Sequence, residues 1–257
     1  MTDCSARPDP ADFRKRLAAG ERLIGTFIKT PTSHTAEIIG DVGYDFVIID
    51  EEHAPFDRIA TDQALLGARA ASTAGFVRVP DSSRILGALD DGAIGIMAPH
   101  IDEADKAKEL VAYARYKPGR RGFSNSPRAG RYGGKDFQAH VAEGDAQTTV
   151  VAMIEDARAV ETIESIVAVE GLDAIFIGRA DLTLSLGAGA PGEPIVQQAV
   201  ERICAAARMA GMRVWVPATS VSERDAYVGL GVNVFVVATD QAFMRRAAAA
   251  SLKELKG

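Results

Sequence analysis

Cysteine and long apolar runs are scarce in this chain of 257 residues. Its two cysteines, Cys4 and Cys204, are too few for a disulfide framework or a thiolate metal cluster, which fits a reducing cytoplasm. No apolar run approaches the roughly 20 residues that span a bilayer, and the polar segment Met1–Arg16 lacks the apolar core of a signal peptide. We therefore expect a cytoplasmic protein without a membrane partner.

An excess of positive charge is also missing, because 29 lysines and arginines stand against 35 aspartates and glutamates, a formal net charge of −6. The average field of such a molecule repels the phosphates of nucleic acids, so we expect no nucleic-acid partner. An apolar content of 47% and a charged content of 25% are typical of a globular protein. At this length the chain is expected to form one large α/β domain, residues 1–257, that acts on a small molecule.

Short apolar runs rich in β-branched residues alternate with amphipathic helical stretches, a pattern that indicates repeated βα units and a parallel sheet. Eight such runs can be identified: Leu23–Lys29, Phe46–Asp50, Gly75–Val79, Ile94–Ala98, Val150–Glu155, Ala174–Gly178, Arg213–Val216 and Val232–Ala238. Eight units spread over the whole chain favour a closed (β/α)8 barrel, a TIM barrel, over an open sheet.

Residues that cap helices mark several expected helix starts. They are Thr32 or Ser33 before Thr35–Gly40, Asp102 before Glu103–Tyr113, and Ser220 or Ser222 before Glu223–Gly229. Gly229 and Gly231 are expected to supply the left-handed conformations that end the last of these helices. The final stretch, Gln241–Lys256, is predicted to be a helix that docks on the barrel or on a neighbouring subunit.

One connection is unusually long. Between Lys117 and Thr149 the chain is rich in glycine, serine and arginine, with no clear periodicity before Asp136. Long loops are usually functional or disordered, which leaves two interpretations open: a mobile insertion after a strand, or a loop at the active site or a subunit contact. A phosphate-binding loop is less favoured, because the glycines lack the Walker spacing.

Polar residues directly follow several expected strands, where barrel enzymes carry their catalytic groups. Glu155 ends one strand, and Asp181 follows the next one along the chain. Carboxylates at the ends of adjacent parallel strands converge on the barrel mouth and offer the hard oxygen ligands that Mg²⁺ or Mn²⁺ prefers. They are therefore candidate ligands of a divalent metal, with Co²⁺ as another candidate ion, although Asp181 is also suited to capping the next helix.

His53 is the best candidate for a catalytic base. An imidazole titrates near neutral pH, and Asp50, at the end of the same strand, is placed to fix its tautomer and raise its basicity. A single histidine is more often structural. The company of three acidic residues, Asp50–Glu52, at a strand end favours the functional interpretation, because buried acids without partners cost several kcal/mol.

Arg78 lies in an otherwise apolar strand, where a guanidinium needs a carboxylate partner or an anionic ligand to offset its lost hydration. Pairing with Asp50 or Glu52, binding of an anionic substrate oxygen, or both at different stages of turnover would satisfy it. The helix start at Gly178–Asp181 also presents free backbone N–H groups on which a substrate carboxylate can rest.

Six segments carry a family resemblance, in order over nearly the whole chain: Phe46–Asp57, Val77–Pro80, Tyr116–Gly122, Ile154–Glu155, Ile177–Thr183 and Phe235–Asp240. Together they resemble the HpcH/HpaI family of class II 2-oxo-acid aldolases. The D-x-E-H-A-P block that begins at Asp50 is specific, and the G-x-A-D-L block that begins at Gly178 strengthens the match.

The resemblance implies a barrel of the phosphoenolpyruvate/pyruvate type and an aldehyde-lyase. Such an enzyme reversibly cleaves a 4-hydroxy-2-oxo acid, through a metal-bound enolate, to an aldehyde and pyruvate or hydroxypyruvate. The resemblance also implies that Glu155 and Asp181 hold the metal, that Arg78 steadies the enolate oxygen, and that His53 with Asp50 moves protons through water. The residues expected to bind substrate are Phe27, Glu52, Arg78, Gly178, Arg179 and Ala180.

Family members assemble as hexamers, trimers of dimers, that exchange their last helix, which suits the stretch Gln241–Lys256. This chain also departs from the family pattern at Phe27, Glu51, His100, Met153 and Arg179. Because these changes alter charge and polarity near the expected mouth, the identity of the aldehyde stays open.

Other activities stay open as well. A 2-oxo-diacid decarboxylase, or a lyase of the malyl-CoA or citramalyl-CoA type, would use the same metal site. A non-catalytic protein that binds metal and oxo acid is an alternative of another class, although it has no need for a base beside the metal. No lysine except Lys29 falls at an expected strand end, which argues mildly against Schiff-base chemistry.

Overall fold

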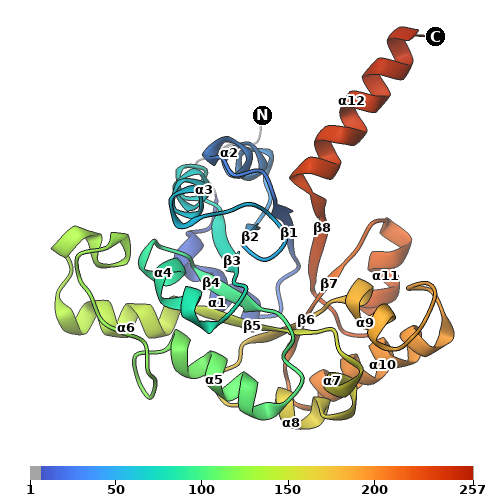
Figure 1. The fold of residues 1–257 in the computed structure, drawn as a ribbon. Coiled ribbons are helices and arrows are strands. Elements are labelled where there is room, and N and C mark those ends of the chain that lie inside the picture. The colour runs from blue at the N-terminus through green and yellow to red at the C-terminus, as the bar shows by residue number, and fades with distance from the viewer. Residues whose placement is uncertain (1–6, 257) are drawn as a thin grey trace.

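The computed structural model describes residues 7–256 and confirms the expected (β/α)8 barrel (Figure 1). Eight parallel strands pair in sequence order, and the last pairs with the first to close the barrel. The strands are β1 (Leu23–Ile28), β2 (Phe46–Asp50), β3 (Ala74–Arg78), β4 (Gly95–Ala98), β5 (Thr149–Ile154), β6 (Ala174–Ile177), β7 (Arg213–Pro217) and β8 (Val234–Thr239).

Helices and short 3-10 turns connect the strands around the outside of the barrel. The α-helices are α1 (Phe13–Ala18), α2 (Ser33–Val42), α3 (Arg58–Ala70), α4 (Ile85–Asp90), α5 (Ala104–Ala114), α6 (Phe137–Gln147), α7 (Ala157–Glu161), α8 (Ile163–Val167), α9 (Arg179–Ser185), α10 (Pro194–Met209), α11 (Val221–Gly229) and α12 (Asp240–Lys256). The 3-10 turns are η2 (Pro10–Asp12), η3 (Ser82–Arg84) and η4 (Arg128–Gly133).

An aromatic cluster fills the N-terminal end of the barrel. Phe13, from α1, lies edge-on to the rings of Phe46, Phe76 and Trp215, with centroids 4.8 to 5.9 Å away. All four side chains are buried, and edge-to-face contacts of this kind stabilise beyond the area that they bury. The N-terminal segment therefore closes the barrel from below, which leaves the other end, where the strands terminate, open for the chemistry.

The segment between residues 117 and 149 is neither an insertion after a strand nor a loop at the active site, and its role in a subunit contact stays a prediction. It follows helix α5 and precedes β5, so it connects a helix to a strand and lies at the N-terminal end of the barrel, not at the mouth. Asp136 caps α6 by accepting hydrogen bonds from the N–H groups of Gln138 and Ala139. Buried Arg121 stacks on Tyr116, so the segment is packed against the protein.

Helix α12 projects away from the barrel (Figure 1). Its first residue, Asp240, is buried and accepts hydrogen bonds from the backbone N–H groups of Lys29 and Thr30, which ties the ends of β8 and β1 together. Beyond Phe243 the helix is exposed, including Leu252 and Leu255. Over residues 7–256, none of the helices combines the length and the apolar character that crossing a bilayer requires.

Candidate active site

Charged side chains converge where the strands end. Asp50 and Arg78 are the last residues of β2 and β3, and their backbones are paired directly across the sheet. Lys29 follows β1, and Glu155 follows β5. The register that makes the barrel thus brings these groups to a single opening.

Asp50 forms the centre of a buried charge cluster. Its Oδ1 and Oδ2 accept hydrogen bonds from Nε and Nη2 of Arg78 at 2.9 and 2.7 Å, and Lys29 Nζ lies 2.8 Å from Oδ2. Burial alone would raise the pKa of Asp50, but the bonds and charges of Arg78 and Lys29 hold it at about 2. Asp50 is therefore an anion at neutral pH and fixes two cations at the mouth.

Arg78 is positioned on three sides. In addition to Asp50, Glu52 Oε2 lies 3.1 Å from Nη1, and the ring of Phe27 lies 4.8 Å from the guanidinium carbon. The guanidinium is almost fully buried, so its orientation is fixed. The expected pairings of Arg78 with Asp50 and with Glu52 are both present, and Phe27 and Glu52 contact its guanidinium.

His53 is placed differently from the expectation. Its backbone N–H donates to Asp50 Oδ1 at 3.1 Å, while its exposed ring lies with Nε2 3.9 Å from Glu52 Oε2. The prediction that Asp50 fixes the imidazole tautomer is therefore wrong, because Arg78, Lys29 and backbone N–H groups take up the carboxylate. The acid nearest to the ring is Glu52.

Glu155 has a different environment. Its Oε1 accepts a hydrogen bond from the backbone N–H of His100 at 2.9 Å, whereas its Oε2 is buried with no partner among the described residues. Burial raises the pKa of Glu155 to about 7, against the lowering effect of His100, and the charges of Asp181 and Glu52 raise it further. A buried carboxylate oxygen without a partner is costly, which points to a missing cation.

Asp181 lies in the first turn of α9, close enough for its charge to act on Glu155. Its carboxylate forms no hydrogen bond or ion pair with another residue in the part of the chain described, and the N-cap of α9 is Gly178. The capping role considered for Asp181 is therefore not observed. A Cβ at Gly178 would lie 2.4 Å from Glu155 Oε2, so only glycine leaves this oxygen free.

The donor set fits a hard divalent cation. Two carboxylates with unpaired oxygens, one just after β5 and one in α9, leave the other coordination positions to water and substrate, as Mg²⁺ sites commonly do. Residues 7–256 contain no cluster of three or more histidine, cysteine, aspartate or glutamate side chains arranged for a metal. An all-protein cage of the kind that structural zinc uses is thus absent there.

The side chain of Arg179 is paired within the protein. Its guanidinium forms an ion pair with Glu223 of α11 and lies over the ring of Tyr227. Its charged side chain is therefore already occupied between α9 and α11. Arg179 and Ala180 stay candidates for substrate binding through their backbone N–H groups at the start of α9.

Two departures from the family pattern are structural. Glu51 forms a bidentate pair with Arg84, with both distances 3.0 Å, and accepts a hydrogen bond from Thr61, so it does not change the charge of the mouth. Met153 is buried in the barrel interior. The charge effect expected of Glu51 at the mouth is thus not found.

His100 lines the site and adopts an unusual backbone conformation. With φ of 54° it presents its N–H to Glu155, while its ring Nδ1 lies 3.1 Å from Asp156 Oδ2. The sequence identified His100 only as a residue near the mouth, and it identified Lys29 only as a strand end. Their direct contacts with Glu155 and Asp50 depend on strand register, which cannot be inferred from the residue types alone.

Comparison with known proteins identifies the family of this chain. The model of the HpcH/HpaI aldolase/citrate lyase family matches residues 23–246. The chain is 33% identical to a hydroxypyruvate/pyruvate aldolase of Roseobacter denitrificans, covering 90% of this chain and 92% of that protein. It is 34% identical to a 4-hydroxy-2-oxovalerate aldolase of Rhodococcus jostii, covering 88% and 91%.

A solved structure is similar over the whole fold. An HpcH/HpaI aldolase/citrate lyase family protein from Burkholderia cenocepacia superposes with a TM-score of 0.90 at 32% identity. The match covers 96% of this chain and 100% of that one.

Proposed function

Because this chain belongs to the HpcH/HpaI aldolase/citrate lyase family, and is thus a carbon–carbon lyase, we propose that it is a metal-dependent class II aldolase. The proposed reaction is the reversible cleavage of a 4-hydroxy-2-oxo acid to an aldehyde and pyruvate or hydroxypyruvate. The observation that carries the proposal is the buried, unpartnered Oε2 of Glu155, which lies beside Gly178 and under the influence of the Asp181 charge.

Glu155 and Asp181 would hold the divalent metal, Mg²⁺ or Mn²⁺ by the chemistry of these ligands, with Co²⁺ as a further candidate. When bound, the ion acts as a Lewis acid toward the oxygens of a 2-oxo acid. The proton that Glu155 carries below its pKa of about 7 must leave before the carboxylate can bind a cation. Metal loading is therefore expected to strengthen as the pH rises toward that value.

Arg78 supplies a fixed positive charge for the keto oxygen, on which negative charge develops as the C3–C4 bond breaks. Its buried guanidinium is oriented by Asp50 and Glu52 before substrate arrives, so little reorganisation is needed during the reaction. Lys29, held by the same Asp50, adds a second cation at the mouth. These cations favour an anionic 2-oxo acid over a neutral ketone.

His53 is the proposed proton carrier. Its exposed ring can exchange protons with a water molecule at the mouth, while Glu52, 3.9 Å from Nε2, is the carboxylate that can stabilise an imidazolium. Asp50 acts on His53 only through the backbone N–H. We therefore propose His53 and Arg78 as catalytic residues and Asp50 as a positioning residue.

A coupled assay tests this function. Pyruvate release from a 4-hydroxy-2-oxo acid is measured after exhaustive chelation, after addition of Mg²⁺, Mn²⁺ or Co²⁺, and in Glu155→Gln. We expect release only in the metal-loaded wild type. Cleavage at the full rate after chelation would rule out the proposal.

The protein is further proposed to work as a cytoplasmic homo-oligomer, a hexamer built as a trimer of dimers. The long exposed part of α12, with Met244, Leu252 and Leu255 on its surface, supports a role in subunit contact. The buried free thiol of Cys204 fits a reducing compartment.

A further inference from the structure

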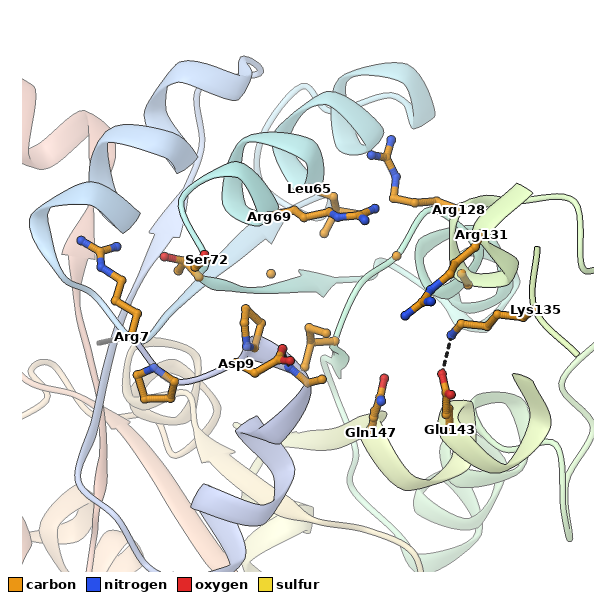
Figure 2. Close-up of a pocket in the computed structure, with 18 residues that line it drawn as sticks. Arg7, Asp9, Leu65, Arg69, Ser72, Arg128, Arg131, Lys135, Glu143 and Gln147 are labelled. Atoms are coloured by element: carbon orange, nitrogen blue, oxygen red, sulfur yellow. Dashed lines mark hydrogen bonds and ion pairs between the residues drawn. The ribbon is translucent and has the colours of Figure 1, made fainter. Parts of the chain in front are cut away.

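A cavity lies at the opposite end of the barrel from the candidate active site (Figure 2). It has a volume of about 590 Å³ and is bounded by the start of β3 at Gly75, by Ile94 just before β4, and by the segment before α1. Gly75 is the second residue of β3, and Arg78 ends this strand about 10 Å further along at the usual rise per residue. The cavity is therefore separate from the proposed chemistry.

The cavity is strongly cationic in an acidic protein. Its five basic residues are Arg7, Arg69, Arg128, Arg131 and Lys135, against only two carboxylates, Asp9 and Glu143. This excess of three positive charges stands in a chain whose net charge is −6. Such a concentration of like charge costs free energy unless a counter-ion offsets it.

Internal partners neutralise only part of this charge. Arg128 pairs with Asp62, and Lys135 Nζ lies 2.8 Å from Glu143 Oε2. Arg7 donates to the backbone carbonyls of Asp41 in α2 and of Ala71 at the end of α3. The side chains of Arg69 and Arg131, by contrast, make no hydrogen bond or ion pair with any residue in the described range 7–256. Two solvent-exposed guanidiniums therefore remain whose donors bind no group of the described chain.

These free guanidiniums face the same space from two different elements. Figure 2 shows Arg69 reaching from α3 along the upper edge of the cavity and Arg131 descending into it, with Lys135 beside Arg131. Gln147 of α6 faces them from below. Groups that are far apart in the sequence therefore converge on one position.

The backbone at Arg131 is strained. Arg131 and Tyr132 both adopt the left-handed conformation, with φ of 51° and 56°, which costs a non-glycine residue about 1–2 kcal/mol. Hydrogen bonds from Gly133 N to Asn125 O and from Asn125 Nδ2 to Lys135 O, each 2.7 Å, hold the turn in place. Strain of this kind is retained most often at ligand sites.

We propose that this cavity binds a small phosphorylated metabolite, whose phosphate groups are held by Arg69 and Arg131 and assisted by Lys135. Guanidinium groups bind phosphate oxygens in a bidentate manner, and the positive charge that remains after Asp62 has paired with Arg128 favours a phosphorylated anion. A cavity of about 590 Å³ lies within the range of small-molecule sites. The site is independent of the aldolase reaction.

Calorimetric titration of the metal-free protein with inorganic pyrophosphate at low salt tests the proposal. We expect saturable binding to the wild type. In Arg69→Gln/Arg131→Gln the Kd is expected to rise about a hundredfold, roughly tenfold for each guanidinium that no longer binds the phosphate. The control Arg22→Gln/Arg208→Gln removes the same charge from two exposed arginines and should keep the wild-type Kd.

Three results would overturn the proposal: no saturable binding, equal Kd values in the wild type and Arg69→Gln/Arg131→Gln, or citrate binding more tightly than pyrophosphate. The last would assign the cavity to a polycarboxylate. Lyase activity of Arg69→Gln/Arg131→Gln should equal that of the wild type, which shows that the variant is folded. The active-site cations are intact in this variant. Pyrophosphate that binds at the mouth would therefore still bind to the variant, which distinguishes such binding from binding in the cavity.

Discussion

At the scale of single residues, two buried carboxylates in one opening have opposite acidities. Asp50 has a pKa of about 2 because Arg78 and Lys29 overcome the effect of burial. Glu155 has a pKa of about 7 because burial dominates and one oxygen has no partner. This difference in pKa indicates different roles: Asp50 positions two cations of the protein, whereas Glu155 is suited to bind an added metal cation.

Asp50→Asn should destabilise the protein, because it leaves two cations without their shared anion. Loss of one partner from a buried ion pair costs about 3–5 kcal/mol. Since the pKa of Asp50 is lowered from 3.8, its contribution is present above that pH and is lost as the pH falls through about 2. Urea unfolding should therefore show a large difference from wild type at pH 7 that narrows in acid.

The matched control for this comparison is Asp105→Asn, on the exposed surface of α5, where only Lys108 pairs with the carboxylate. Little change in stability is expected there, because an exposed ion pair is screened by solvent. Equal stability of Asp50→Asn and wild type at pH 7 would contradict the positioning role.

Glu155→Gln should have the opposite effect on the metal-free protein. The folded-state pKa of Glu155 is raised from 4.5, so its ionisation opposes folding increasingly from that pH up to about 7, and fully above it. The penalty is on the order of 3 kcal/mol. Thermal unfolding without metal should thus show a higher Tm for Glu155→Gln than for wild type at pH 8, and nearly equal values at pH 4.

Added Mn²⁺ provides the internal check. It should raise the Tm of the wild type and leave the Tm of Glu155→Gln unchanged, because a ligand that binds only the native state stabilises that state. A wild type that is the more stable of the two at pH 8 without metal would contradict this account of Glu155.

Residue identities at the site could be predicted from the sequence, but several contacts could not. A carboxylate after a buried strand marks the mouth whatever its rotamer, which is why Glu155 and Asp50 are found there. The partner of Glu51, by contrast, is Arg84, which lies 33 positions along the chain. The ring of His53 points toward Glu52, a choice that depends on side-chain packing.

At the scale of elements, buried parallel strands are the best-predicted feature, because both faces are apolar. All eight predicted strands are confirmed, most with ends shifted by one or two residues, and Phe46–Asp50 has the expected bounds. Helix ends are less regular. Asp102 does not cap α5, since it pairs with Lys106 and Glu103 takes the N-cap position.

The ends of α11 are also predicted only in part. Ser220 caps the helix as one of the two expected residues, and Gly231 has the expected left-handed conformation, with φ of 91°. Gly229, however, lies inside the helix, and Leu230 is the C-cap. Neighbouring glycines offer the chain equivalent stopping points, and tertiary packing selects one.

Phe13→Ala tests the closure of the barrel by α1. Removal of a fully buried phenylalanine ring costs about 3–5 kcal/mol, and Phe13 contacts three other aromatic rings. We expect a loss of that size in urea unfolding, whereas kcat of the folded variant stays near the wild-type value because the mouth lies at the other end. Phe137→Ala, at an exposed position on α6, is the control and should cost less than about 1 kcal/mol. A large fall in the kcat of the folded variant would show that the two ends of the barrel are coupled.

At the scale of the whole molecule, one barrel separates two charged sites. The mouth combines cations with the free carboxylates of the proposed metal site, and the opposite end carries the cationic cavity. Strand β3 reaches both ends, at Gly75 and at Arg78. The direction of a parallel sheet predicts the first site from sequence, whereas the second depends on how a helix-to-strand connection folds against α3.

Helix α12 is expected to determine assembly. A chain that ends at Arg246 keeps the Asp240 contacts and the packing of Phe243 on Tyr44, so the barrel should stay folded. Removal of the exposed apolar residues beyond it should lower the mass in light scattering from a multiple of 27.2 kDa toward a smaller multiple. An unchanged mass would show that α12 is not a subunit contact.

The most direct test of the proposed metal site is the exchange of the pyruvate methyl protons for deuterium, followed by NMR in D₂O. The wild type should exchange them when Mn²⁺ or Mg²⁺ is present and stop after chelation, and Asp181→Asn should exchange them far more slowly at equal metal concentration. Exchange that continues at the wild-type rate in the chelated protein, or in Asp181→Asn, would contradict the claim that these two carboxylates hold the catalytic cation.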